Sequence, residues 1–316
     1  MTDRLRLAHL TDPHLPFAEP RGTELIGKRG LGWLSWRLKR RRRQGPEVAE
    51  ALLSDLHAAS PDLIAMTGDL VTFSLAREFA AARVWLERLG PPDRVIVTAG
   101  NHEALTAGWA ARMAAAWGSY GRGPGGEEPP FLVDSGSAAL IAVPTAVATA
   151  PFLATGRTGA EARARAAALI AAARAGGRLP LVLMHHPPTP VAARRRSLTD
   201  AAEVRAALAG AALVLHGHTH RPELSWIDGP HGRIPVLGAP GFAARPGFGE
   251  PPGAWRLLEI APGPDGWRAT VTERAITPSG EVHSRTPLVF ALPGPAVAAP
   301  AGSTKVAESR LGGSAP

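Results

Sequence analysis

Polar residues that can bind metals stand in five short clusters, each directly after an apolar run. The clusters are Asp12-Pro-His14, Gly68-Asp69, Gly100-Asn101-His102-Glu103, His185-His186 and His216-Gly217-His218-Thr219-His220. They offer carboxylate, amide and imidazole groups but no sulfur, because the 316-residue chain has no cysteine. Imidazole and oxygen donors together suit zinc, iron, manganese or cobalt. The lack of cysteine also excludes disulfides, thiolate metal sites and a thiol nucleophile.

The clusters contain more donors than one tetrahedral ion takes. Residues at i and i+2 on an extended chain point the same way, so Asp12 with His14 and His218 with His220 can each supply two groups. Two ions about 3.5–4 Å apart, bridged by a carboxylate, would use the whole set. Such a pair can hold a hydroxide and clamp the oxygens of a phosphoryl group.

The apolar runs that precede the clusters alternate with helical patterns. Strands are expected at Leu5–Leu10, Leu63–Thr67, Val95–Thr98, Ala138–Val143, Leu181–Met184 and Leu213–Leu215. Helices are expected at Pro46–Ala59, Leu75–Leu89, Ala104–Trp117, Gly159–Ala175 and Thr199–Leu208. This alternation indicates an α/β fold, in which ligands bind beyond the carboxyl ends of the strands. The five clusters are therefore predicted to converge on one crevice.

After Arg221 the pattern changes to short strand-like pieces separated by Gly and Pro. We expect them to form β-hairpins that complete a second sheet. The pieces are Ser225–Ile227, Ile234–Leu237, Trp255–Ile260 and Trp267–Thr272.

In their order and strand contexts, the five clusters resemble the motifs of the calcineurin-like metallophosphoesterase family over residues 5–220. The resemblance implies an α/β two-sheet sandwich flanked by helices (αββα). It implies two divalent or trivalent transition-metal ions, such as Mn, Fe or Zn, with a bridging hydroxide that attacks phosphorus in line. One metal would be held by Asp12, His14, Asp69 and His220, and the other by Asp69, Asn101, His185 and His218. His102 would be catalytic, contacting the phosphate and helping the leaving oxygen.

Residues beside these motifs are assigned other roles. His185 is preferred to His186 as the ligand because the family motif places it two residues before a proline, here Pro187. A supporting or substrate-contacting role remains open for His186. Glu103 is expected to start a helix or support the site, and His216 to pack behind it.

The chain is expected to form one domain over residues 1–291, with an insertion at about 20–45. Residues 292–316 are rich in Ala, Pro, Gly and Ser, which predicts a flexible tail. No apolar segment of a secretory signal follows Met1, so a cytoplasmic location is expected. If the insertion binds a membrane, the protein would lie at the surface of the inner membrane. The uncharged stretch Ser135–Gly156 is interrupted by prolines, which favours a buried strand and a loop over a membrane span.

The insertion carries the net charge of the chain. Nine basic residues and one acidic residue lie between Arg21 and Arg43, and the formal net charge of the whole chain is +8. Trp33, Leu34 and Leu38 could form an apolar stripe beside these cations, a composition typical of membrane interfaces. One interpretation is therefore peripheral membrane contact through Trp33, Trp36, Arg37, Lys39, Arg40, Arg41, Arg42 and Arg43. Two alternatives stay open: a solvated loop whose tryptophans pack on the domain, and nucleic-acid binding, which a single basic spot disfavours.

Three functions are compatible with this sequence. The leading one is metal-dependent hydrolysis of a small-molecule or lipid-linked phosphoester, most readily a phosphodiester. The second is a pyrophosphatase acting on a nucleotide-linked lipid at the membrane surface, which the insertion favours. The third, a non-catalytic interaction module on the same fold, would be expected to have lost ligands, and this chain has kept them all.

Overall fold

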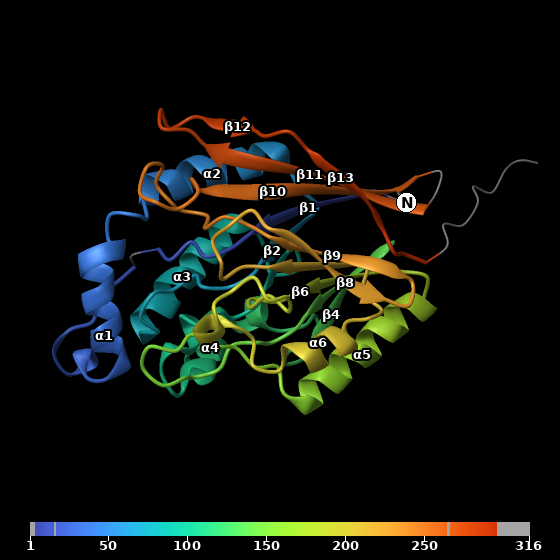
Figure 1. The fold of residues 1–316 in the computed structure, drawn as a ribbon. Helices are drawn as coiled ribbons and strands as arrows, with labels where there is room; N and C mark the ends of the chain where they lie inside the picture. Colours follow the sequence, from blue (N-terminus) through green and yellow to red (C-terminus); the bar gives the residue numbers. More distant parts are fainter. Residues whose placement is uncertain (1–3, 16, 264–265, 296–316) are drawn as a thin grey trace, which may run out of the picture.

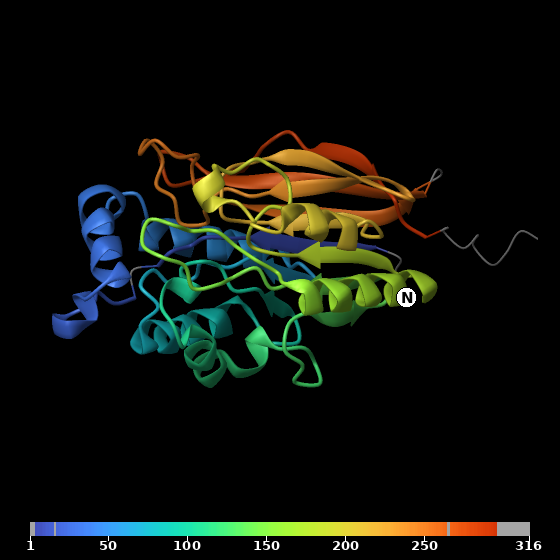
Figure 2. The same cartoon turned by 60° about the horizontal axis from the view of Figure 1, so that its bottom comes forward.

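Two mixed β-sheets packed face to face form the centre of the protein (Figures 1 and 2). The computed structural model describes residues 4–15, 17–263 and 266–295. The strands of the first sheet run in the order β12-β11-β10-β1-β2-β3, with β13 beside β11. They are β1 (Leu5–Leu10), β2 (Leu63–Met66), β3 (Val95–Val97), β10 (Ala254–Gly263), β11 (Gly266–Ile276), β12 (Val282–Ser284) and β13 (Leu288–Leu292).

The second sheet has the order β4-β5-β6-β7-β9-β8. Its strands are β4 (Phe131–Ser135), β5 (Ala138–Ala142), β6 (Leu179–Leu183), β7 (Leu213–His216), β8 (Leu224–Gly229) and β9 (Gly232–Gly238). Neighbouring strands from β5 to β9 along this order run parallel, while β4 and β8 are antiparallel edge strands.

Helices cover the outer face of each sheet, which gives the predicted αββα sandwich. The first sheet packs against α2 (Pro46–Ala59), α3 (Ala76–Leu89) and α4 (Trp109–Trp117). The second sheet packs against α5 (Ala160–Ala175) and α6 (Ala201–Ala207). In the insertion, α1 (Lys28–Ser35) continues into a π-helical turn, Trp36–Arg40. Short 3₁₀ turns occupy Gly22–Leu25, Glu103–Leu105, Gly118–Gly121 and Arg194–Arg196.

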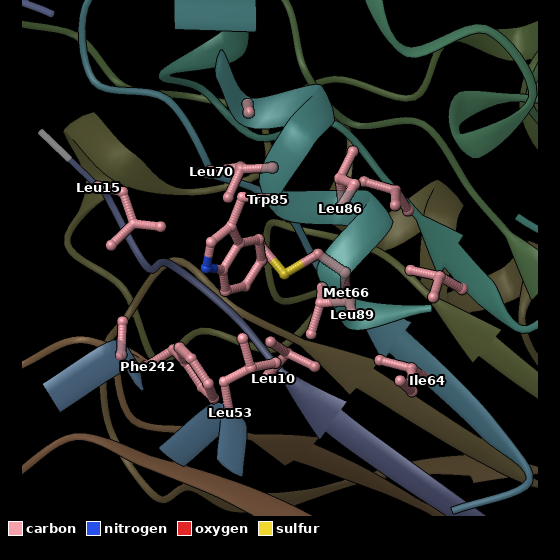
Figure 3. Close-up of a cluster of buried hydrophobic side chains, with 14 of the residues drawn as sticks. Leu10, Leu15, Leu53, Ile64, Met66, Leu70, Trp85, Leu86, Leu89 and Phe242 are labelled. Atoms are coloured by element: carbon pink, nitrogen blue, oxygen red, sulfur yellow. The ribbon is translucent and has the colours of Figure 1, made fainter. Parts of the chain in front are cut away.

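Strand β1 is buried on both faces. Leu5 and Leu7 point into the core between the two sheets, whereas Ala8 and Leu10 point toward the helices. A strand buried on both faces is apolar at most positions, and β1 departs from this only at Arg6 and His9. Figure 3 shows the helix-side cluster, in which Trp85 of α3 lies among aliphatic side chains of β1, β2 and α2.

The carboxyl-terminal hairpins differ from the sequence expectation. The β8–β9 hairpin joins the second sheet as expected, but β10 and β11 extend the first sheet, with Leu258 of β10 opposite Leu7 of β1. The expectation of one shared sheet was wrong because alternation along a strand does not specify which edge it joins. Leu258 and Ile260 enter the core between the sheets beside β1, which favours this edge.

Two other boundaries also differ. Helix α4 begins five residues after the predicted Ala104, because Gly108, with φ of +72°, separates it from the preceding 3₁₀ turn. Leu292, the first residue of the predicted tail, is buried as the last residue of β13. Residues 296–316 of that predicted tail lie outside the described residues. Among the described residues, no helix is long and apolar enough to cross a bilayer.

Candidate metal centre

The loops that follow the strands are joined by main-chain hydrogen bonds. The amide of Asp12 donates to the carbonyl of Gly68 at 3.0 Å, and the amide of His14 donates to the carbonyl of Asp69 at 3.1 Å. In the other sheet, the amide of Gly217 donates to the carbonyl of His185 at 3.1 Å. As a result, the seven side chains predicted as ligands lie together. Six are buried and His220 is half-buried.

One cluster of donor atoms comes from Asp12, His14 and His220. His220 Nε2 lies 3.2 Å from Asp12 Oδ1 and 3.2 Å from His14 Nε2. His14 Nε2 is 3.7 Å from the same Asp12 oxygen. The other oxygen of Asp12 accepts hydrogen bonds from the Thr11 hydroxyl and the His218 amide, which directs Oδ1 toward the imidazoles.

A second cluster comes from Asn101, His185 and His218. His218 Nδ1 lies 2.8 Å from Asn101 Oδ1 and 3.2 Å from His185 Nε2. His185 Nε2 is also 3.2 Å from Asn101 Oδ1. Three lone-pair-bearing atoms therefore face one another in a buried space.

Asp69 lies between the two clusters. Its Oδ2 is 3.7 Å from His14 Nε2 in the first cluster and 3.4 Å from His185 Nε2 in the second. Its Oδ1 accepts a hydrogen bond from the amide of His102 at 2.7 Å. One oxygen is thus held by the main chain, and the other is directed at both clusters.

These residues fit a pair of cations. Donor atoms about 2.0–2.2 Å from a tetrahedral ion stand roughly 3.4 Å apart, close to the separations in both clusters. Asp12 Oδ1 is buried and faces the imidazole nitrogens of His14 and His220, and among the described residues no main-chain or hydroxyl group donates to it. Imidazole nitrogens 3.2 Å apart require a proton or a cation between their lone pairs. The donor set is the nitrogen–oxygen mixture that suits Mn, Fe or Zn.

The far nitrogens of two imidazoles are held by main-chain carbonyls. His185 Nδ1 donates to the carbonyl of Thr67 at 2.7 Å, and His218 Nε2 donates to the carbonyl of Arg196 at 2.8 Å. Such contacts fix the tautomer and the ring orientation of metal-binding histidines. In both residues the other nitrogen is left to face the second cluster.

His220 is held by a carboxylate that sequence reasoning did not single out. Its Nδ1 lies 3.2 Å from Glu250 Oε2, and Glu250 also pairs with Arg43 of the insertion at 3.0 Å. The hydrogen bond from His220 lowers the pKa of Glu250 to about 2. Glu250 lies in the loop between β9 and β10, far from every motif, and no local signal distinguishes it.

Five of the seven predicted ligands adopt left-handed backbone conformations, which are unfavourable for residues other than glycine. The φ angles are +49°, +43°, +56°, +71° and +56° for Asp12, His14, Asp69, His218 and His220. Backbone strain of this kind clusters at functional sites, where surrounding contacts must maintain it.

Glu103 provides such contacts. Its buried carboxylate accepts hydrogen bonds of 2.7–3.0 Å from the amides of Asp69, Leu70, Val71 and Gly100. Burial, with the charge of Asp69, raises its pKa to about 7. Glu103 therefore joins the loops after β2 and β3, in agreement with the supporting role expected for it.

The electrostatics of the clusters favour cation binding. Burial lowers the pKa of His14 to about 3 and that of His218 well below its usual value, so both rings are neutral. Burial also opposes the charged form of His185 and His220, but Asp69 raises the pKa of His185 to about 9, and Asp12 raises that of His220 to about 10. Without metal, these two protons occupy the positions that a cation would take.

His102 lies beside the first cluster and is half-buried. Its Nδ1 donates to the carbonyl of Thr72 at 2.8 Å, and its ring centroid is 4.5 Å from that of His14. One of its nitrogens lies within 4.8 Å of the donor atoms of His14 and Asp69. His102 is therefore partly exposed beside the first cluster.

The remaining histidines are placed differently. His186 has both nitrogens engaged, with the Thr145 hydroxyl at 2.9 Å and the Ala154 carbonyl at 3.2 Å. No lone pair of its ring is left for a metal, although it lies beside His218. His216 is buried at the end of β7, and burial lowers its pKa to about 4.

Comparisons with known proteins identify the family of the chain. The model of the family described as calcineurin-like phosphoesterase matches residues 5–222, more than half of the chain. The chain belongs to this family. A protein from Synechococcus named a probable cyclic nucleotide phosphodiesterase is 29% identical to this phosphoesterase over 233 residues, covering 71% of this chain and 81% of the relative.

Solved structures share the fold at low sequence identity. A dimetal phosphatase from Danio rerio superposes with a TM-score of 0.57 at 12% identity, covering 89% of this chain and 98% of that one. The NAD nucleotidase of Haemophilus influenzae gives 0.50 at 14% identity, covering 90% of this phosphoesterase, which spans only 54% of the nucleotidase. These two similarities concern the fold alone. Family membership makes the protein a hydrolase acting on phosphoesters, rather than a non-catalytic module, and implies a dinuclear metal centre.

Proposed function

We propose that this phosphoesterase hydrolyses phosphodiesters at a pair of metal ions. One ion would be held by Asp12, His14, Asp69 and His220, and the other by Asp69, Asn101, His185 and His218. The observation that carries this proposal is the position of Asp69 Oδ2, 3.7 Å from His14 Nε2 and 3.4 Å from His185 Nε2. A single carboxylate oxygen that faces two clusters is suited to bridge two cations.

The cations and the side chains around them have different roles in the reaction. When bound, the cations supply a hydroxide at neutral pH and neutralise charge on the phosphoryl oxygens. Asp12 and Asp69 remain ionised because the imidazoles around them hold their pKa values well below the usual range, although burial alone would raise them. His102, oriented through Thr72, contacts a phosphoryl oxygen and gives a proton to the leaving oxygen.

The first test is hydrolysis of bis(p-nitrophenyl) phosphate with Mn²⁺ supplied. Asp69→Asn removes the bridging charge and is expected to lower kcat/KM about a thousandfold or more. His102→Ala is expected to cost roughly a hundredfold or more, with the metal content unchanged. Asp228→Asn and His57→Ala, which alter exposed residues away from the site, are the matched controls. Wild-type rates in both site variants would refute the assignment.

The second test is a substrate panel of cyclic nucleotides, glycerophosphodiesters, p-nitrophenyl phosphate and nucleotide-diphosphate lipids. The Synechococcus relative's name makes cyclic nucleotides the first diesters to try. The proposal expects the highest kcat/KM on a phosphodiester. Highest activity on a nucleotide-diphosphate lipid would replace the proposal with the pyrophosphatase alternative, and highest activity on the monoester would overturn both.

A further inference from the structure

The insertion at residues 20–45 places its tryptophans against the body of the protein. Trp36 is only 4% exposed and meets the ring of Phe73 edge-on at 5.5 Å. Trp33 packs against the same cluster, and its indole donates to Glu19 at 3.1 Å. The tryptophans therefore pack on the domain, as the solvated-loop interpretation predicted, and membrane contact through Trp36 is wrong because that residue is buried.

The opposite face of the same helix is apolar and exposed. Leu31, Leu34 and Leu38 follow one another at helical spacing, and Leu38 is 72% exposed. Ile26, just before the helix, is 74% exposed. Figures 1 and 2 show α1 standing out from one end of the molecule, away from both sheets.

A second segment extends this apolar surface. The ammonium of Lys28 donates to the Thr149 carbonyl and hydroxyl and to the Leu153 carbonyl, at 3.1, 2.6 and 3.0 Å. These bonds hold a loop beside α1, as Figure 2 also shows. In this loop Phe152 is 82% exposed, with φ of +67°, and Leu153 is also exposed. Among the described residues, half of the exposed large apolar side chains belong to these two segments.

Cations border this surface, and acidic residues are missing from it. Arg37, Arg41 and Arg42 are exposed, and no acidic residue lies between Glu24 and Glu47. The guanidinium of Arg37 stacks over the ring of Trp33, with the guanidinium carbon 5.1 Å from the ring centroid. Two attractions hold peripheral proteins on anionic bilayers. Apolar side chains enter the boundary of the acyl chains, and cations pair with lipid phosphates.

We propose that this docking face binds an anionic membrane surface. The docking face consists of Ile26, Leu31, Leu34, Leu38, Phe152 and Leu153, with Arg37, Arg41 and Arg42 at its border. Nucleic acid would use the arginines but not the six apolar side chains. The acid-free charge and the projecting shape of α1 fit a negatively charged lipid surface better than a protein partner of mixed charge.

Hydrogen bonds connect the two segments that carry the docking face to residues on both sides of the metal centre. Arg29 of α1 donates to the carbonyls of Phe73 and Ser74. These residues directly follow Thr72, whose carbonyl accepts the hydrogen bond of His102. Ala154, next to Leu153, accepts the hydrogen bond of His186. Docking would therefore bring the catalytic site near the headgroup layer. This last inference rests on the proposed function, whereas docking itself does not.

The test is sedimentation of the full chain with large vesicles at physiological ionic strength. One set contains phosphatidylcholine and phosphatidylglycerol in equal parts, and the other contains phosphatidylcholine alone. Wild-type protein is expected to sediment with the anionic vesicles much more than with the neutral ones. Arg41→Ser with Arg42→Ser should lower the partition coefficient about 30-fold, or roughly fivefold per cation. The triple change Leu31→Ser, Leu34→Ser and Leu38→Ser should lower it about tenfold or more.

Matched controls separate docking from general effects of charge or apolarity. Val84→Ser, Phe248→Ser and Val289→Ser remove three exposed apolar side chains elsewhere, and Arg165→Ser with Arg268→Ser removes two exposed cations. These controls should sediment like wild type, and every variant should hydrolyse bis(p-nitrophenyl) phosphate at the wild-type rate. Docking-face variants that keep hydrolysis but no longer sediment with anionic vesicles would support docking. A wild-type protein that does not hydrolyse the substrate would count against the proposed function only.

Three results would overturn the docking proposal. The first is equal sedimentation of wild type with both vesicle sets. The second is an equal loss in the control variants. The third is release from anionic vesicles by duplex DNA at equal phosphate concentration, which would assign the cations to nucleic acid.

Discussion

The metal centre and the docking face both depart from the usual rule that polar side chains are exposed and apolar side chains are buried. The centre buries polar groups, and the docking face exposes apolar ones. The centre buries two carboxylates and three imidazoles, whereas the docking face exposes six large apolar side chains. Unpaired buried charge and contiguous exposed apolar surface are both unfavourable for an isolated chain. Each arrangement becomes favourable when something binds from outside, cations in the first case and, in our proposal, lipid in the second.

The two regions also differ in how firmly they are held. Five ligands in left-handed conformations are fixed by hydrogen bonds from neighbouring loops, so the centre has little freedom to adjust. The docking face depends on a few contacts at the base of α1, mainly those of Trp36 and Lys28. Small changes should therefore be costly for function at the centre and harmless to folding at the docking face.

Of the changes that compare the two regions, the addition of one methyl group at the centre should have the largest effect. In Gly100→Ala the new Cβ would lie 2.2 Å from Asp69 Oδ1 and 2.7 Å from His185 Cε1, so both ligands must move. We expect kcat/KM for bis(p-nitrophenyl) phosphate to fall about a hundredfold or more. The control is Gly32→Ala in α1, where the added Cβ meets nothing within 4 Å. Equal activities would show that the centre is as tolerant as the docking face.

Metal affinity should depend strongly on pH. His185 and His220 have pKa values raised to about 9 and about 10, so in metal-free protein both rings hold a proton at neutral pH. Metal binding must release these protons, and its apparent affinity should rise with pH, by up to about a hundredfold per unit, and level off above the raised values. Calorimetry in buffers of different ionisation enthalpy counts the released protons. No release at neutral pH would contradict this account.

The two faces of α1 should respond differently to truncation. Trp36→Ala removes a buried ring and should lower the free energy of unfolding of the insertion by about 3 kcal/mol. Leu34→Ala alters an exposed side chain and should change it by no more than about 0.5 kcal/mol. Amide hydrogen exchange over residues 21–45 measures this local stability. Equal changes would mean that the helix has no preferred inner face.

The smallest effect is expected at Glu250, which connects Arg43 of the insertion to His220 of the metal centre. Glu250→Gln keeps an acceptor for His220 but removes the charge that faces it, and metal affinity should fall about tenfold. Competition with a chromophoric chelator measures this affinity without turnover. Glu50→Gln, which weakens an exposed pair with Arg88, is the control. Unchanged affinity in Glu250→Gln would remove this carboxylate from the support of the centre.

The pattern of residues by itself indicated an α/β fold and one crevice for the five clusters, and the resemblance of these motifs to a family implied the αββα class and the set of ligands. The α/β fold and the crevice could be predicted because they depend on local patterns: buried strands are rich in apolar residues, and each predicted ligand follows such a strand within a few residues. The cationic character of the insertion could also be read from the chain alone, since it depends only on composition.

Only the tertiary structure decided that β10 and β11 join the first sheet, that Trp36 faces inward while the leucines face outward, and that Glu250 reaches His220. Each of these depends on contacts between residues far apart in the chain. A local pattern records which residues are apolar or charged, but the partner that covers or neutralises them is fixed only when distant segments pack together.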